Sequence, residues 1–228
     1  SHSAITPTYK IPEKGKLSEA ENQVYSTVFR RFVAVFCAKD CLAERTEITV
    51  KVGDYDRQTY AEALFWRGEA HFRSGNYNQA SRDYAQYLKV APDQRGLTYG
   101  RGLYGLGYTY FVQKNYQQAF KQFDRLMKTE AVTSRLMDKT TIADAQMRIG
   151  DCYFYSRKYT AAETAYNNAI NTDPSQADYA VYQKAFTQGL TGRYSDKIGT
   201  LTFLTESYPQ SDYIDDALYE KGRAYVQL

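Results

Sequence analysis

The sequence has few of the residues that bind metals or form disulfides. Its 228 residues include two histidines and three cysteines, and three cysteines do not make a disulfide framework in a chain of this length. Cys37 and Cys41 would share one face if they were helical, but two thiols without a nearby histidine are an incomplete metal site. We therefore expect neither a metal nor any other cofactor.

Long apolar runs and a large excess of one charge are missing as well. No uninterrupted apolar run approaches the roughly 18 residues that cross a membrane. The net charge of +3 is too small by itself to imply a nucleic-acid-binding surface. The sequence therefore predicts no membrane span, and nucleic acid is not the partner that we expect.

Tyrosine is the residue present in excess. The chain has 23 tyrosines, and only Tyr9, Tyr25 and Tyr55 precede residue 60. The apolar content of 43% and the charged content of 24% are those of an ordinary folded protein, so the tyrosines mark a local bias. This bias predicts two unlike parts, residues 1–58 and residues 59–228.

A repeat runs through the second part and can be aligned on five small residues, which we call anchors. The anchors are Gly68, Gly107, Gly150, Ala185 and Gly222. Nine residues after the first four come Tyr77, Tyr116, Tyr159 and Tyr194. Twelve residues after them come Ala80, Ala119, Ala162 and the exception Lys197. Sixteen residues after them come Tyr84, Phe123, Tyr166 and Leu201. So many shared offsets indicate a repeated structural unit.

Each unit has the pattern of a helical hairpin. Two apolar stripes at helical spacing flank a short break such as "RSGNY" or "LTGRY". A small anchor and an alanine let two antiparallel helices approach, and Pro92, Pro174 and Pro209 follow the second helix, which proline cannot continue. One hairpin cannot bury its apolar face alone, so several must stack. The pattern predicts four hairpins and an interrupted fifth, and we expect the native protein to continue beyond Leu228.

These offsets resemble those of the tetratricopeptide repeat (TPR) family. The resemblance implies an all-α TPR-type superhelix of antiparallel hairpins over residues 59–228. The anchor spacings of 39, 43, 35 and 37 exceed the family's period of about 34 residues, and the extra residues are expected in loops around "QRGLT" and "TSRLMDKTT". The segments "SYPQSDYIDDALYEKGRAY" and "APDQRGLTYGRGLYGLGYTY" resemble the envelope-associated branch of the family. That likeness implies a bacterial periplasmic or cell-envelope location.

The first part lacks the repeat and has different signals. Ser18 and Glu21 form a capping box before a helix that carries Val24, Val28 and Phe32 on one face. The segment 46–52, "TEITVKV", alternates like a β-strand. The first part is therefore predicted to be a loop, a helix and one short strand. The open edge of that strand would offer a route to a homodimer.

The first part resembles type IA DNA topoisomerases. The likeness rests on "HSAITPT" (His2 to Thr8), "LSEAENQVYSTVFRRFVAVF" and "ERTEITVKVGDY", in that order. In that family the first of these stretches lies near the DNA-cleaving centre. Because type IA topoisomerases are cytosolic DNA enzymes, the resemblance implies a cytoplasmic origin for this part. No acidic metal-binding domain and no segment like the one with the cleaving tyrosine is found here, so we expect no enzyme activity. We interpret the chain as an engineered or accidental chimera, with a natural fusion as the alternative.

The TPR resemblance implies that the first helices line a concave groove. Their inward positions lie six and three residues before the anchor, and one, four and five residues after it. The expected partner-binding residues are Phe65, Glu69, Phe72, Arg73, Arg101, Tyr104, Tyr108, Phe111, Met147, Asp151, Phe154, Tyr155, Tyr182 and Phe186. Large rigid aromatic side chains with hydroxyl groups suit an extended or helical peptide. The sequence therefore predicts a scaffold that binds an unknown protein or peptide without catalysis.

Three other interpretations remain open. Many of the predicted groove rings would serve equally well as core residues between helices. In the second, the topoisomerase-like first part binds DNA through Arg30, Arg31 and Lys51, without strand-passage activity. The third is a structural envelope component that works as an oligomer. A clamp for a terminal carboxylate is not expected, because only Arg73 and Arg101 of the required basic set are present.

Overall fold

The computed structural model describes residues 56–228, and these residues are helices joined by short turns. The all-α prediction is confirmed for this part of the chain. The predicted N-terminal helix, the 46–52 strand and the dimer through it lie outside the described residues. The first described helix begins at Asp56, slightly before the predicted boundary at residue 59, which stays a prediction. The chain divides into two compact units between Gln94 and Arg95.

The first unit contains one hairpin in its described part. Helix α2 (Asp56–Arg73) and helix α3 (Tyr77–Val90) pack against each other. The guanidinium of Arg67 donates to both carboxylate oxygens of Asp83, at 2.9 and 2.6 Å, which joins the two helices. Tyr84 is fully buried against the anchor Gly68.

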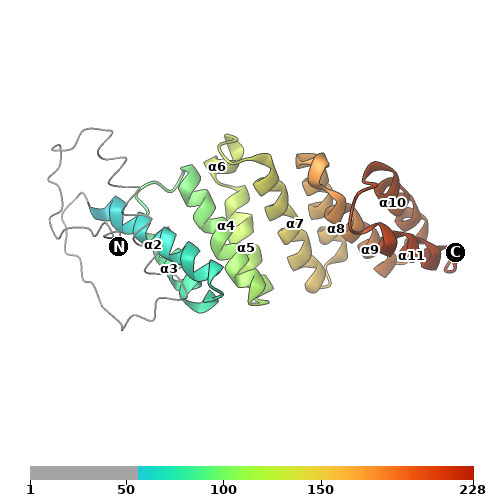
Figure 1. The fold of residues 1–228 in the computed structure, drawn as a ribbon, viewed down its shortest axis with the longest axis horizontal. Coiled ribbons are helices and arrows are strands. Elements are labelled where there is room, and N and C mark those ends of the chain that lie inside the picture. The colour runs from blue at the N-terminus through green and yellow to red at the C-terminus, as the bar shows by residue number, and fades with distance from the viewer. Residues whose placement is uncertain (1–55) are drawn as a thin grey trace, which may run out of the picture. The chain divides into compact units, whose positions relative to one another are not determined.

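The second unit continues the same plan through three more hairpins and a further first helix (Figure 1). The hairpins are α4 (Leu97–Val112) with α5 (Tyr116–Met127), α7 (Lys139–Tyr155) with α8 (Tyr159–Thr172), and α9 (Asp178–Leu190) with α10 (Tyr194–Ser207). Helix α11 (Ile214–Tyr225) follows them. Each second helix also packs against the next first helix, α5 on α7, α8 on α9 and α10 on α11. This shared packing stacks the hairpins in chain order.

Prolines mark the ends of three of the four second helices. Helices α3, α8 and α10 end two residues before Pro92, Pro174 and Pro209. The second hairpin has no such proline, and the short helix α6 (Glu130–Thr133) follows it instead. Ala131 of α6 is fully buried, and a Cβ on Gly100 would lie 2.8 Å from the Ala131 Cβ. The loop expected around "TSRLMDKTT", residues 133–141, is therefore preceded by a packed helical turn, and its residues 139–141 already belong to α7. A 3₁₀ turn, η1 (Pro174–Gln176), leads into α9.

All four hairpin turns share one backbone conformation. The residue seven positions after each anchor has a positive φ, namely Gly75 (77°), Lys114 (59°), Arg157 (58°) and Gly192 (74°). In each turn the amide of this residue donates to the carbonyl four positions after the anchor, and the next amide donates to the carbonyl three positions after it. This double bond pattern is the Schellman ending of a helix, which favours glycine at the left-handed position. The breaks read from the sequence are thus helix C-caps.

The two non-glycine turns predict a measurable gain from glycine. A left-handed conformation costs an ordinary L-residue roughly 1–2 kcal/mol, part of which the greater entropy of glycine in the unfolded chain offsets. We expect Lys114→Gly to raise the free energy of unfolding by about 0.5–1 kcal/mol in urea titrations followed by circular dichroism. Gly192→Ala, the reverse change in the fourth turn, should lower it by about 1 kcal/mol. A loss of stability in Lys114→Gly would contradict the assigned turn.

The glycine anchors of the first three hairpins are small because an aromatic ring from the second helix lies against each of them. A Cβ added to Gly107 would approach the Phe123 ring to 2.7 Å, and one added to Gly150 would approach the Tyr166 ring to 2.5 Å. In the fourth hairpin the residue sixteen positions after the anchor is Leu201 instead of an aromatic residue. The anchor there is Ala185, whose methyl group lies in the same core cluster as Leu201. The anchor therefore complements the volume of its partner.

The residues one and sixteen positions after the anchor form a second pair between the two helices of a hairpin, and its chemical character alternates from one hairpin to the next. One position after the anchor, Glu69 accepts a hydrogen bond from the Tyr84 hydroxyl at 2.7 Å, and Asp151 accepts one from the Tyr166 hydroxyl at 2.8 Å. The same two positions of the second hairpin hold Tyr108 and Phe123, whose rings meet edge to face at 5.8 Å. Those of the fourth hold Phe186 and Leu201. Polar pairs thus occupy the first and third hairpins, and apolar pairs occupy the second and fourth.

Candidate functional site

The predicted groove residues of the first unit are largely engaged within their own hairpin. Phe65 is buried and meets the rings of Tyr84 and Tyr87 edge to face. Glu69 accepts the Tyr84 hydrogen bond and pairs with Arg73 at 2.8 Å. The ring of Phe72, the remaining predicted residue of this unit, packs against Tyr77.

In the second unit the first helices α4, α7 and α9 are joined by a polar and aromatic cluster. We call it the Arg148 cluster; its members are Tyr104, Tyr108, Phe111, Asp144, Arg148, Asp151, Tyr166 and Tyr179. Arg148 lies in the middle of α7 and reaches both acidic residues of that helix. Its Nη1 lies 2.6 Å from Asp151 and its Nη2 lies 3.4 Å from Asp144.

Four tyrosine hydroxyls complete the coordination of the two carboxylates. Tyr104 and Tyr108 of α4 donate to one oxygen of Asp144, at 2.8 and 2.6 Å. Tyr166 of α8 and Tyr179 of α9 donate to one oxygen of Asp151, both at 2.8 Å. Asp144 therefore ties α7 to α4, and Asp151 ties α7 to both α8 and α9.

Aromatic rings surround the guanidinium itself. Arg148 Cζ lies 5.9 Å from the centroid of Tyr108, 5.5 Å from that of Phe111 and 5.0 Å from that of Tyr179. Cation–π contacts of this kind contribute roughly 0.5–2 kcal/mol, with the larger values where water is excluded. The arginine is thus held both by its hydrogen bonds and by the ring faces.

The titration behaviour of the cluster follows from its burial. Burial raises the pKa of the Tyr104, Tyr108, Tyr166 and Tyr179 hydroxyls, so all four remain protonated donors at neutral pH. Burial also raises the pKa of Asp151, while Arg148 and the two hydroxyls that donate to it oppose that change. Two carboxylates and one guanidinium leave the cluster with one net negative charge when both acids are ionised. The arrangement offers a fixed aromatic surface with the partly exposed carboxylate of Asp144 beside it, while Asp151 is buried.

The other predicted residues of this unit differ in what they expose. Met147 is buried in the core with Tyr166, and Asp151 is also buried. Tyr155 stacks flat on Tyr116 at 4.3 Å yet remains 58% exposed. The half-buried rings of Phe154 and Phe186 meet at 6.0 Å across α7 and α9.

Two more of the predicted residues lie at the margins of this set. Tyr182 stacks on Tyr213, with ring centroids 5.2 Å apart, and Arg101 is exposed on α4. The structure therefore brings Tyr104, Tyr108, Phe111 and Asp151 together in one cluster. Of the other predicted residues of this unit, Met147 belongs to the core and the rest lie outside the cluster.

Arg148 was not predicted, because it lies two residues before the anchor, outside the inward offsets. A signal for it was present in the sequence, since Asp144, Arg148 and Asp151 are spaced four and three residues apart and so share one helical face. Opposite charges at that spacing predict an ion-pair row on α7.

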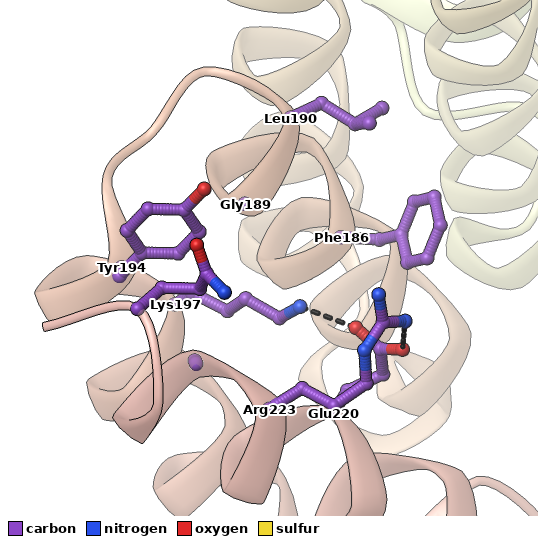
Figure 2. Close-up of a pocket in the computed structure, with 9 residues that line it drawn as sticks. Phe186, Gly189, Leu190, Tyr194, Lys197, Glu220 and Arg223 are labelled. Atoms are coloured by element: carbon purple, nitrogen blue, oxygen red, sulfur yellow. Dashed lines mark hydrogen bonds and ion pairs between the residues drawn. The ribbon is translucent and has the colours of Figure 1, made fainter.

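A second polar centre lies between α10 and α11. Lys197 occupies the position that is alanine in the first three hairpins; it is buried and forms an ion pair with Glu220. Arg223 donates to the other oxygen of Glu220 at 2.9 Å. Hydrogen bonds from both cations lower the pKa of Glu220 in spite of its burial. A pocket of about 300 Å³ opens beside this trio, next to Phe186 and Tyr194 (Figure 2).

The remaining reactive group of the described chain is the thiol of Cys152. It is buried beside the Gly150 anchor, and burial raises its pKa to about 12. A thiol in this state is a packing group and a poor nucleophile at neutral pH. In residues 56–228 no helix is both long and apolar enough to span a bilayer.

Comparison with known families identifies the repeat. Profiles described as tetratricopeptide repeat match residues 61–94, 101–130 and 143–176. These segments correspond to the first three hairpins of the structure.

Solved structures show the same fold. The chain is similar to YrrB, described as a TPR protein with an unusual peptide-binding site, with a TM-score of 0.61, 15% identity, and 88% of each chain covered. It is similar to a MamA protein with a TM-score of 0.60 and 20% identity, covering 76% of this chain and 83% of that one. A MamA fragment from Desulfovibrio magneticus RS-1 gives a TM-score of 0.55 at 18% identity, covering 67% of this chain and 77% of that one. At these identities the likeness shows the fold alone.

One curated protein shares a short stretch of sequence. DNA topoisomerase 1 of Pyrococcus horikoshii is 36% identical over 55 residues, which is 24% of this chain and 8% of that protein. The match therefore spans a small fraction of that enzyme's length.

Proposed function

Because the chain carries tetratricopeptide repeats on a stacked-hairpin fold, we propose that it is a non-catalytic scaffold that binds a partner peptide along the first helices α4, α7 and α9. The observation that carries the proposal is the Arg148 cluster. Its partly exposed tyrosines, Tyr104, Tyr108 and Tyr179, are fixed by hydrogen bonds to carboxylates, so a partner that packs on them orders few side chains of the protein. Peptide binding by YrrB, as its description states, agrees with this use of the fold.

The partly exposed rings give the partner's site its chemical character. Tyr104, Tyr108 and Phe111 on α4 and Phe186 on α9 are all half-buried, so each keeps surface for a partner. Such aromatic residues are over-represented among the side chains that dominate binding energy. The net negative charge of the Arg148 cluster favours a peptide that carries basic or neutral residues there.

Peptides selected from a random phage-displayed library provide the test. We expect the double change Tyr104→Ala and Tyr108→Ala to weaken a selected peptide by at least tenfold, about 1.4 kcal/mol, in isothermal titration calorimetry. Phe203→Ala is the matched control, because Phe203 is an exposed ring on the second helix α10. Circular dichroism would verify that both variants fold. Equal affinity of the double variant and the control would contradict the proposed surface.

A second candidate function is supported by the topoisomerase similarity. In this alternative the first part retains affinity for single-stranded DNA, without strand passage, and is joined to the repeats as a chimera. Fluorescence anisotropy with an oligonucleotide at several salt concentrations would test it, since phosphate contacts weaken steeply as salt rises. No salt-dependent binding would count against DNA recognition, and the coding DNA across residues 50–62 would show whether the two parts share one gene. An envelope location of the repeat part is likewise a proposal, which cell fractionation would test.

A further inference from the structure

The first three hairpins each place a phenylalanine against the tyrosine that begins the second helix. The phenylalanine lies four residues after the anchor and the tyrosine nine residues after it. The pairs are Phe72 with Tyr77 at 5.6 Å and 61°, Phe111 with Tyr116 at 5.6 Å and 68°, and Phe154 with Tyr159 at 5.8 Å and 63°. These are edge-to-face contacts of nearly constant geometry.

The fourth hairpin keeps the tyrosine and lacks the phenylalanine. Gly189 stands at the phenylalanine position, and Tyr194 begins α10 as Tyr77, Tyr116 and Tyr159 begin their helices. The pocket of about 300 Å³ lies here and is lined by Gly189 and Tyr194 together with Phe186 and Lys197 (Figure 2). In the fourth hairpin the Lys197 stem therefore lies where the side chain of a phenylalanine would begin, and the pocket opens beside it, next to Tyr194.

Lys197 explains why the glycine is needed and places an ammonium at the pocket. A Cβ at position 189 would lie 2.9 Å from Lys197 Cδ, so the glycine makes room for the lysine stem. The ammonium pairs with Glu220 and lies 5.9 Å from the Phe186 ring centroid. An ammonium held at a ring face in this way also favours a second ring brought into the same pocket.

We propose that this pocket takes an aromatic side chain of the partner polypeptide. The partner's ring enters the pocket beside Tyr194, whose edge-to-face partner in the other hairpins is a phenylalanine that the fourth hairpin lacks, and it lies close to the Lys197 ammonium. This inference rests on the proposed function, because it assigns one subsite to the same bound peptide. An aliphatic side chain offers neither the edge-to-face contact nor the cation–π contact.

The direct test uses a small probe, N-acetyl-L-phenylalaninamide, titrated into isotope-labelled protein and followed by NMR. We expect saturable shifts in the millimolar range at Gly189, Tyr194 and Lys197. N-acetyl-L-leucinamide should bind at least fivefold more weakly. Gly189→Phe, which restores the missing ring, should weaken the phenylalaninamide by at least tenfold.

A second variant and a control keep the test decisive. Tyr194→Ala removes the pocket wall without adding volume, so it should weaken the probe even if Gly189→Phe folds poorly beside Lys197. Tyr77→Ala changes the equivalent tyrosine of the first hairpin, where Phe72 already occupies the space, and should leave the probe's affinity unchanged. Absence of shifts at the pocket, equal binding of the two amides, or undiminished binding in both pocket variants would overturn the inference.

Selected peptides separate this inference from the proposed function. Peptides that need Tyr104 and Tyr108 but bind Gly189→Phe and Tyr194→Ala as well as the original protein would overturn the pocket assignment alone. Binding of the amide at the pocket, with no peptide dependent on Tyr104 and Tyr108, would instead count against the proposed surface on α4. If peptides selected on the original protein share an aromatic residue at one position, and peptides selected on Gly189→Phe do not, both the proposed function and the pocket assignment would be supported.

Discussion

Replacing Gly150 with alanine is expected to lower the free energy of unfolding by about 2 kcal/mol. The new Cβ would lie 2.5 Å from Cε1 of Tyr166, whose side chain is fully buried and cannot move aside freely. Overpacking of a core costs roughly 1–3 kcal/mol, and an approach of 2.5 Å places the cost at the upper end of that range. The gain of about 1 kcal/mol from replacing a helical glycine offsets part of this cost, which leaves a loss of about 2 kcal/mol. Urea titration followed by circular dichroism at the helix band would measure the change.

A glycine elsewhere in the same fold supplies the control. Gly199 is exposed within α10, and a Cβ there would meet nothing within 4 Å. Gly199→Ala should therefore raise the free energy of unfolding by about 0.5–1 kcal/mol, so that the two substitutions have opposite signs. If Gly150→Ala stabilised the protein as much as Gly199→Ala, the close approach of the Tyr166 ring would be refuted.

The fourth hairpin suggests how the damage could be reversed. There Ala185 stands in place of the glycine anchor and Leu201 in place of the ring. Adding Tyr166→Leu to Gly150→Ala reproduces that combination, and we expect the two changes to be coupled by at least about 1 kcal/mol in a double-mutant cycle. Additive effects would mean that the anchor and its partner do not share volume.

Replacing Asp151 with alanine should be the most damaging single change in the Arg148 cluster. It leaves Arg148, whose side chain is 19% exposed, without its 2.6 Å partner, and it removes the acceptor of both the Tyr166 and Tyr179 hydroxyls. Breaking a buried, hydrogen-bonded pair costs about 3–5 kcal/mol, and we expect a loss near the lower end because Arg148 keeps some contact with water. The loss would be measured by urea titration.

Asp124→Ala is the matched control for that experiment. Asp124 pairs with Lys128 on the exposed side of α5, where the lysine side chain is 72% exposed. Surface pairs of this kind contribute roughly 0.2–1 kcal/mol, so the control should change stability by less than 1 kcal/mol. Similar losses for the two substitutions would contradict the central place of Asp151 in the packing of α7, α8 and α9.

The sequence was enough to place the helices because the local rules and the repeat agree. The tyrosines nine residues after the anchors begin α3, α5, α8 and α10, and the prolines follow the helix ends. Turn geometry was less visible, because Lys114 and Arg157 occupy a left-handed position usually marked by glycine. The short helix α6 was missed since four residues carry no periodicity of their own.

The site was predicted less completely than the fold, for a physical reason. Inward offsets identify a face of each helix, and they found Tyr104, Tyr108 and Asp151. They cannot tell which of these side chains neighbouring helices cover, so groove and core stayed open as alternatives for the rings, and the structure buries Phe65 and Met147. Lys197 was noticed only as an exception to the alanine rule, because its partner Glu220 lies 23 residues away in another hairpin.

The alternation of polar and apolar pairs between hairpins bears on how the chain finds its correct pairing as it folds. Repeated hairpins of one design can pair with the wrong neighbour, which is a characteristic failure of repeat proteins. If α7 paired within a hairpin with α5 instead of α8, the carboxylate of Asp151 would face the hydrocarbon ring of Phe123 and lose the Tyr166 hydroxyl. A buried carboxylate without such partners is costly, so the alternation penalises misregistered assembly and makes neighbouring hairpins non-interchangeable.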